Sequence, residues 1–253
     1  MNFFKRTISV VLIIAVLLSM ATSFGFATSN SPEIKAQTAV IYNGQTDEIL
    51  WQKDADKRME PASITKLMTA LVTIENLELG SVVTITEEVE DIEPTEIGLV
   101  EGEEITVRDL LYATLIYSAN DAATALAIET SGTVEDFAVL MNKKAKELGC
   151  ENTNFVNASG LSDDDHYSTA LDLAVIAKAA LSNAEIRKIS GTTEYTIPET
   201  NLSDKREISN FNLFLKGKEF TYDETTIKVE KYKGVFGGKT GTLSDDYTTM
   251  VTG

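Results

Sequence analysis

Helical patterns occupy the middle of this 253-residue chain, while β-forming residues gather near both of its ends. Apolar runs at 39–42 and 48–51 flank Asn43-Gly44, which predicts a hairpin with a longer turn. Three more strand-like runs follow Thr192, and these are residues 193–197, 225–229 and 247–251. We therefore predict an α/β (α+β) fold in which both chain ends build one antiparallel sheet around an inserted helical subdomain.

The helical subdomain is expected to span about residues 61–189, and the sheet subdomain about residues 35–60 plus 190–253. Three of its helices follow a Thr-x-x-Asp capping pattern that starts at Thr106, Thr133 or Thr169. The segments predicted inside this subdomain are helices at 63–76, 107–116, 121–132, 134–149 and 170–181, a strand at 81–85 and a solvated acidic loop at 87–96.

The first of these helices carries a serine and a lysine on one face. Pro61 suits a first helical turn, because that turn has no use for the N–H that proline lacks. Ser63 and Lys66 are three residues apart, so their side chains share a face. An uncharged amine there can take the proton of a serine nucleophile, and the helix start favours developing negative charge. A capping serine followed by a surface lysine would give the same pattern, so both interpretations stay open at this point.

Two further motifs supply the partners that such a nucleophile needs. Ser118-Ala119-Asn120 lies between two predicted helices, and Lys239-Thr240-Gly241 lies in a glycine-rich, strand-like stretch. The patterns S-x-x-K, S-x-N and K-T-G each occur once, in this order. This trio is typical of penicillin-binding proteins and serine β-lactamases. Its presence favours the catalytic interpretation of Ser63 and Lys66.

The chain resembles the serine-type D-alanyl-D-alanine carboxypeptidases, the low-molecular-mass penicillin-binding proteins of the bacterial cell wall. The resemblance runs from about Ala39 to the last residue, and it includes Asn157-Ala158-Ser159-Gly160-Leu161 and His166-Tyr167-Ser168-Thr169-Ala170. It implies the penicillin-binding protein / serine β-lactamase-like fold. It also implies an acyl-enzyme reaction on peptidoglycan stem peptides that end in D-Ala-D-Ala, with β-lactam antibiotics as covalent inhibitors and no metal or cofactor.

The resemblance implies catalytic roles for three residues. Ser63 would attack the carbonyl between the two D-alanines, and its backbone N–H would form half of the oxyanion hole. Lys66 would be the general base, and a nearby cation such as Lys239 would help to keep it uncharged. Ser118 would relay a proton to the leaving amine.

The resemblance also implies substrate-binding roles. Asn120 would hydrogen-bond the amide backbone of the substrate. Lys239 and Thr240 would bind its terminal carboxylate, as an ammonium and a hydroxyl can do. The backbone N–H of Thr242, which follows Gly241, would complete the oxyanion hole.

Other functions of the same fold stay open. A class A β-lactamase deacylates with a glutamate in an E-x-x-x-N pattern, and no such pattern lies between Ser118 and Lys239, which disfavours that enzyme. A D,D-endopeptidase or a transpeptidase is not distinguished by these motifs. A non-catalytic wall-binding module would be a different class of protein, but it would not need both Ser63 and Lys66.

His166 is the only histidine and follows three aspartates at 163–165. A Ser–His–Asp site is disfavoured because the chain has no G-x-S-x-G turn. The spacing of the aspartates does not fit an EF-hand calcium loop, so we predict a loop role for His166 and a solvated run for the aspartates. Phe236 stands where many relatives have an acidic residue, and it is expected to alter the floor of the cleft.

The net charge of −17 argues against binding to nucleic acid or to an anionic membrane surface. Residues 1–27 have the pattern of a secretory signal peptide, with Lys5 and Arg6 before an apolar run and a small-x-small site at 25–27. We therefore expect export to the cell wall or to the outer face of the cytoplasmic membrane. The single cysteine, Cys150, excludes an internal disulfide and is predicted to be a buried apolar residue.

The catalytic domain is expected to occupy residues 28–253. The resemblance implies a further strand and a terminal helix beyond Gly253, and in many relatives a β-rich domain and an amphipathic membrane anchor. We expect this chain to lack these parts, and membrane association would need that anchor. A sheet edge would then be uncovered, so the chain alone is expected to be poorly stable.

Overall fold

The structure is a computed structural model that describes residues 33–89, 94–222, 225–244 and 247–253. The chain divides into two units, Met1–Ala36 and Gln37–Gly253, and every described helix and strand belongs to the second. The predicted signal peptide at residues 1–27 lies outside the described residues and stays a prediction. Within the described ranges, no helix combines the length and the apolar character needed to cross a bilayer.

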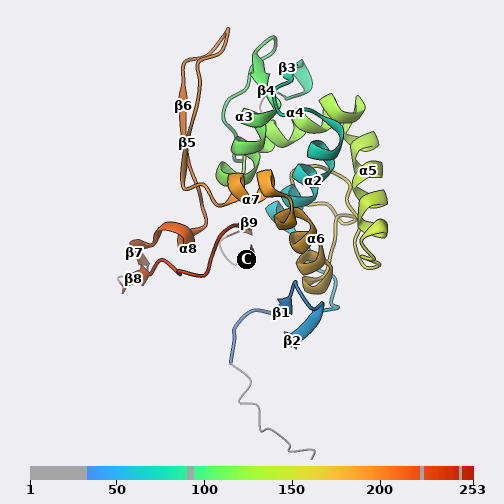
Figure 1. Cartoon of the computed structure of the whole chain (residues 1–253), viewed down its shortest axis with the longest axis vertical. Helices are drawn as coiled ribbons and strands as arrows, with labels where there is room; N and C mark the ends of the chain where they lie inside the picture. The colour runs from blue at the N-terminus through green and yellow to red at the C-terminus, as the bar shows by residue number, and fades with distance from the viewer. Residues whose placement is uncertain (1–32, 90–93, 223–224, 245–246) are drawn as a thin grey trace, which may run out of the picture. The chain divides into compact units, whose positions relative to one another are not determined.

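Helix α2 (Lys66–Asn76) is the central helix of the helical block (Figure 1). It follows a 3-10 turn, η1 (Ala62–Thr65), and the two together cover the helix that was predicted at 63–76. Its first two turns are buried, and it packs against the helices α4 (Asn120–Ser131), α5 (Val134–Glu147) and α6 (Ala170–Ser182). Because neighbours surround this helix, water has little access to its first turn.

The three predicted threonine caps start helices α3 (Val107–Tyr112), α5 and α6. In each case the threonine hydroxyl accepts the backbone N–H three residues later, which satisfies a donor that the first turn leaves unpaired. Helix α7 (Ala184–Ser190) was not predicted, although Asn183 caps it in a similar way, through the N–H groups of Glu185 and Ile186.

The helix predicted at 107–116 is an α-helix only in its first part and becomes a π-helix just before the S-x-N motif. After α3 the chain widens into a π-helix, η3 (Ala113–Tyr117), a type of turn that is frequent at functional sites. Ser118 then adopts a left-handed backbone with φ of 69°, and α4 begins two residues later. The change of direction places Ser118 and Asn120 at the corner between two helices.

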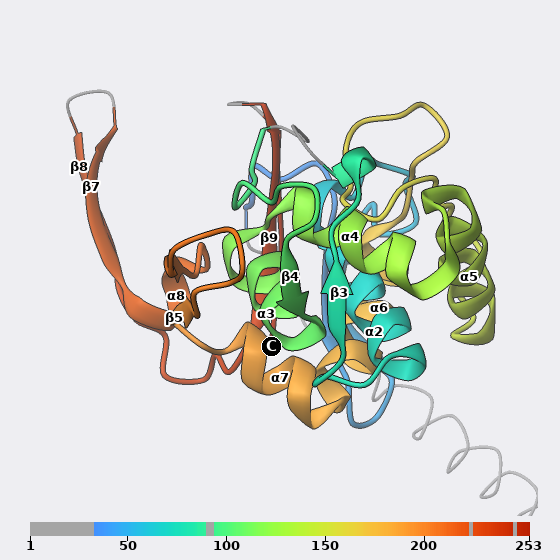
Figure 2. The ribbon, with the colours of Figure 1, turned by 90° about the horizontal axis from the view of Figure 1, so that it is seen from above.

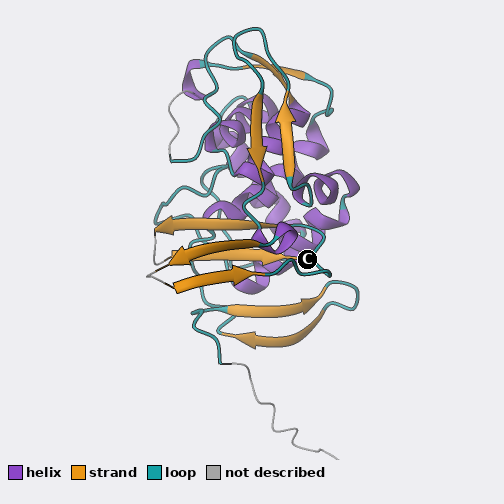
Figure 3. Cartoon of the chain, turned by 90° about the vertical axis from the view of Figure 1, so that its left-hand side faces the viewer, coloured by secondary structure: helices purple, strands orange, loops and turns teal. Residues whose placement is uncertain are grey.

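The described strands form five antiparallel pairs and not one continuous ladder (Figure 3). Both terminal hairpins nevertheless lie on the same helix, because β1 and β10 each pack against α6. The α/β class is confirmed, while the predicted single sheet is seen as separate hairpins. The pairs are β1 (Ala39–Asn43) with β2 (Glu48–Lys53), β3 (Val82–Thr84) with β4 (Glu104–Thr106), β5 (Glu194–Ile197) with β6 (Arg206–Ser209), β7 (Lys218–Tyr222) with β8 (Thr225–Val229), and β9 (Gly238–Ser244) with β10 (Tyr247–Thr252).

Two short helical segments complete the described fold. The 3-10 turn η2 (Glu87–Val89) lies in the acidic stretch that was predicted as a loop, and helix α8 (Leu213–Lys216) precedes the β7–β8 hairpin. Figure 2 shows this hairpin extending away from the helical block. The division into subdomains at 35–60 plus 190–253 and at 61–189 stays a prediction.

Cys150 belongs to the hydrophobic core that the helices share. Its side chain is buried and its sulfur contacts the backbone oxygen of Asp172 at 3.6 Å. Burial raises the pKa of this thiol to about 12, so the group is inert at neutral pH. The predicted role of Cys150 as a small apolar residue is confirmed.

Candidate active site

Backbone from two other parts of the chain encloses Ser63. Ala62, just before it, has a φ of 50°, a left-handed conformation that a non-glycine residue rarely adopts. Gly160 approaches so closely that a Cβ on it would lie 1.9 Å from the Ala62 oxygen. On the other side, a Cβ on Gly241 of β9 would lie 2.9 Å from the Ser63 nitrogen. Ser63 is therefore held between a loop of the helical block and strand β9.

Lys66 is fully buried at the first position of α2. In the described part of the chain its Nζ has three oxygen partners: Ser63 Oγ at 3.0 Å, Asn120 Oδ1 at 2.7 Å and the Ser159 carbonyl at 2.6 Å. The amide and carbonyl oxygens can only accept hydrogen bonds, whereas the serine hydroxyl can also donate one. An uncharged amine satisfies this set with its two N–H bonds, and its lone pair then faces the hydroxyl of Ser63.

The electrostatic surroundings favour the uncharged amine. Burial lowers the pKa of Lys66 well below its usual value, and the positive charge of Lys239 lowers it further. Asp121 acts in the opposite direction, because its carboxylate favours the protonated amine. The two effects that lower the pKa prevail over the one that raises it.

Lys239 is a second buried lysine, and it approaches from β9. Its Nζ donates to Ser118 Oγ at 2.8 Å and to the Thr240 carbonyl at 2.6 Å. Burial lowers the pKa of Lys239 to about 7. Thr242, two residues beyond Thr240 on the same strand, has an exposed side chain. Six of the eight predicted site residues thus fall into two hydrogen-bonded groups, one around Lys66 with Ser63 and Asn120, and one around Lys239 with Ser118 and Thr240.

Asp121 fixes the segment that lies beside Asn120. The N–H of Asn120 donates to the Thr95 carbonyl at 2.6 Å. The buried carboxylate of Asp121 accepts the backbone N–H groups of Ile97 at 3.0 Å and Leu99 at 3.2 Å. No role was predicted for Asp121 from the sequence, although it directly follows the S-x-N motif.

His166 does not form the Ser–His–Asp arrangement that was weighed from the sequence. One ring nitrogen, Nε2, contacts Thr65 Oγ1 at 2.8 Å, and the other, Nδ1, accepts the Val156 N–H at 3.1 Å. Both nitrogens are therefore occupied away from Ser63. The sequence also assigned no role to the Ser159 carbonyl, and the only signal for it was the Asn157–Leu161 stretch of the resemblance.

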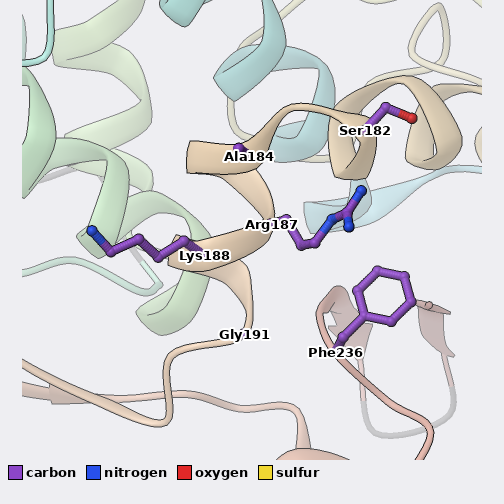
Figure 4. Close-up of a pocket in the computed structure, with 6 residues that line it drawn as sticks. All are labelled: Ser182, Ala184, Arg187, Lys188, Gly191 and Phe236. Carbon is purple, nitrogen blue, oxygen red and sulfur yellow. The ribbon is translucent and has the colours of Figure 1, made fainter.

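A surface cavity of about 460 Å³ lies elsewhere, beside α7. Figure 4 shows the ring of Phe236 facing the Arg187 side chain there, and the guanidinium carbon lies 5.3 Å from the ring centre. None of the predicted site residues lines this cavity. Phe236 faces Arg187 of α7 there, and its expected effect on the floor of the cleft stays a prediction. The lining residues are Ser182, Ala184, Arg187, Lys188, Gly191 and Phe236.

Comparison with known proteins gives matches along most of the chain. The profile of a family described as D-alanyl-D-alanine carboxypeptidase matches residues 26–251. The D-alanyl-D-alanine carboxypeptidase DacF of Bacillus subtilis is 36% identical over 247 residues, which are 94% of this chain and 59% of that protein. The chain therefore spans less than two thirds of the length of this relative.

Two solved structures share the architecture. The D-alanyl-D-alanine carboxypeptidase of Mycobacterium tuberculosis is 30% identical, with a TM-score of 0.77, and the match covers 87% of this chain and 78% of that one. A DD-transpeptidase of Streptomyces is 32% identical, with a TM-score of 0.73, over 83% of this chain and 81% of that one. These likenesses confirm the fold that was predicted from the three motifs.

Proposed function

Because this chain belongs to the D-alanyl-D-alanine carboxypeptidase family, we propose that it is a serine D,D-carboxypeptidase, which removes the terminal D-alanine from peptidoglycan stem pentapeptides. The observation that carries the proposal is the set of three oxygens around Lys66 Nζ. Asn120 and Ser159 occupy both N–H bonds of an uncharged amine, so its lone pair is directed at the hydroxyl of Ser63. A serine hydroxyl with such a base beside it is an activated nucleophile.

In the first step Ser63 Oγ attacks the carbonyl carbon of the penultimate D-alanine, and its proton passes to Lys66 Nζ. The N–H groups of Ser63 and Thr242 stabilise the oxyanion, and two such donors are worth about 3–4 kcal/mol or more. The C–N bond then breaks, and the leaving amine takes a proton from the hydroxyl of Ser118, which is replaced by the proton that Lys66 took from Ser63. Lys239 stays an ammonium and orients Ser118 through their 2.8 Å contact. Water hydrolyses the resulting ester and restores Ser63.

The substrate is held by the groups around this serine. Its terminal carboxylate pairs with the ammonium of Lys239 and the hydroxyl of Thr240, beside Gly241, where no side chain blocks the approach. Asn120 bonds the peptide backbone of the substrate through its amide. Because the substrate lies in the cell wall, the protein acts outside the cytoplasm, which agrees with the predicted signal peptide at 1–27.

The test uses the full 253-residue chain, labelled penicillin and a peptide that ends in D-Ala-D-Ala. We expect a covalent penicillin adduct and release of free D-alanine, and we expect Ser63→Ala to lose both. Ser182→Ala, which removes an exposed serine whose hydroxyl donates to the Lys178 carbonyl of its own helix, is the matched control and keeps both. Failure of the unaltered chain to form the adduct would exclude a catalytic role and favour a wall-binding module.

Transpeptidation is the second candidate, because a structural neighbour with 32% identity is a DD-transpeptidase. The two reactions share the acyl-enzyme and differ in whether water or an amine attacks it. Adding an acceptor amine to the peptide assay separates them, since a transpeptidase forms the exchanged peptide at the expense of hydrolysis. Rapid turnover of penicillin would instead identify a β-lactamase.

A further inference from the structure

The loop between α5 and α6 reaches the base of the proposed reaction. We call residues 153–168 the base-contacting loop, because its Ser159 carbonyl accepts the 2.6 Å hydrogen bond from Lys66. A second contact lies one residue earlier, where Ala158 O accepts from Thr69 Oγ1 of α2 at 2.6 Å. The position of the Ser159 carbonyl, and with it the orientation of the amine, depends on how firmly this loop is attached to the start of α2.

His166 makes the attachment nearest to Lys66. Its ring is buried, and the edge of Phe155 packs against it. Because the N–H of Val156 donates to Nδ1, that nitrogen carries no proton in the neutral ring, and Nε2–H donates to Thr65 Oγ1. Thr65 directly precedes Lys66 in the chain. One imidazole thus ties the folded loop to the residue next to the base.

We propose that His166 is a positioning residue for Lys66. Its neutral Nε2–H tautomer holds the base-contacting loop against Thr65, so that the Ser159 carbonyl occupies one N–H of Lys66 and leaves the lone pair for Ser63. The inference rests on the proposed function, since Lys66 acts as a base only if Ser63 is the nucleophile. His166 itself contacts neither the substrate nor the reacting atoms.

Burial keeps the imidazole ring of His166 neutral, and charged groups nearby adjust this effect. Lys239 from β9 lowers the pKa of Lys66, and Asp121 from α4 raises it. Burial is the largest cause that lowers the pKa of His166 to about 4, whereas Asp163 raises this pKa and Lys66, in its protonated form, lowers it. A protonated ring would carry N–H on both nitrogens, so it would face the Val156 N–H with a donor and lose that contact.

The first measurement needs no variant, because the chain has one histidine. A nitrogen–proton correlation NMR spectrum of the uniformly labelled chain at pH 7 resolves its two ring nitrogens. We expect Nε2 to be protonated and Nδ1 to be bare. A protonated Nδ1 would overturn the proposal, because the ring could not then join Val156 to Thr65 as described.

The second measurement is the rate of penicillin acylation in His166→Asn, Thr65→Val and the double variant. We expect each single change to slow the acylation step about tenfold, and the double change to cost no more than either one, because both break the same contact. Initial penicillin binding should stay unchanged. Thr73→Val in α2 is the matched control, since the buried Thr73 hydroxyl has no hydrogen-bond partner among the described residues, and this variant should be acylated at the original rate.

Acylation that is unchanged in both single variants, or losses that simply multiply in the double variant, would overturn the proposal. If His166→Asn does not fold, Thr65→Val decides by itself. Failure of the proposed function looks different, because the unaltered chain would then form no adduct. When the unaltered chain is acylated and Ser63→Ala is not, an effect or its absence at Thr65 and His166 concerns only the positioning role.

Discussion

Lys66 and Lys239 are both buried, but the two sides of the site give them different hydrogen-bond partners. The helical side surrounds Lys66 with three oxygens from three separate elements, whereas the strand side gives Lys239 one hydroxyl and one backbone carbonyl. Burial lowers both pKa values, to about 7 for Lys239 and well below the usual value for Lys66, where a second cation adds to the effect. One lysine is thus held as a free base, while the other can still carry a charge near neutral pH.

The difference assigns the two chemical tasks. A general base must be uncharged before the reaction and must hold one orientation, which the helical side enforces through hydrogen bonds at both N–H groups. An anion site needs a charge that can be present at the working pH, which Lys239 has at and below pH 7. Exchanging the two environments would place the charge where the proton acceptor is needed.

Of the two lysines, Lys66 is expected to give the larger loss, because Lys66→Gln removes the base and keeps similar length. We expect penicillin acylation to fall about 10³-fold, within the range of general base catalysis. Lys144→Gln is the matched control, because Lys144 is a partly exposed lysine that pairs with Glu75 and Glu147. Stopped-flow acylation rates measure the effect. A loss smaller than that caused by Lys239→Gln would reverse the comparison between the two lysines.

The two glycines beside Ser63 test which side positions the nucleophile. A Cβ at Gly160 meets backbone at 1.9 Å and φ is 83°, so Gly160→Ala should reduce the free energy of unfolding by about 3 kcal/mol and abolish acylation. Gly241 has no such φ, and its nearest atom is the Thr249 hydroxyl at 2.5 Å, so Gly241→Ala should destabilise less while still slowing acylation. Gly132→Ala is the control for backbone strain. Gly132 has a φ of 88°, and an added Cβ there would meet no atom within 4 Å, so this variant measures the cost of the left-handed backbone alone. Equal unfolding energies for all three variants would contradict this ranking.

Acid should weaken the helical side through His166. The pKa of His166 falls from 6.5 to about 4 on folding, so the unfolded chain binds the proton more tightly. The stabilisation is complete above pH 6.5, and it is lost as the pH falls from about 6.5 to about 4, up to roughly 3 kcal/mol. Chemical unfolding at several pH values measures it, with His166→Asn as the variant that should lack this component. The same pH dependence in both proteins would refute the assignment to His166.

Local patterns in the sequence were sufficient for the parts of this fold that depend on neighbours in the chain. The threonine caps at Thr106, Thr133 and Thr169 and the order of strands and helices follow from residues within a few positions of each other. Helix α7 and the partner strands β4, β6 and β7 were not predicted, because their patterns are short and their pairing is decided by distant residues.

In the candidate site, too, local motifs could be predicted and long-range contacts could not. The residues of the three motifs could be named, because the resemblance carries them as short strings. The contacts around Lys66 could not be predicted from the sequence. The Ser159 carbonyl, which accepts from Lys66, lies 93 residues away in the sequence, and the contact between His166 and Thr65 spans 101 residues. The strain at Ala62 and the π-turn before Ser118 likewise follow from packing and have no local signature.

Of the two lysines, Lys239 is expected to have the smaller effect on the rate, and its substitution also tests the link between the two. Lys239→Gln removes the partner of the substrate carboxylate, so kcat/KM for the D-Ala-D-Ala peptide should fall about 10- to 100-fold, with most of the change in KM. The variant also removes a positive charge that lowers the pKa of Lys66. That pKa should therefore rise, and the acid limb of the acylation rate should move to higher pH. Lys239→Arg keeps the charge and should leave the acid limb near its original position. An acid limb that stays in place in Lys239→Gln would show that burial alone, without the charge on the strand side, keeps Lys66 uncharged.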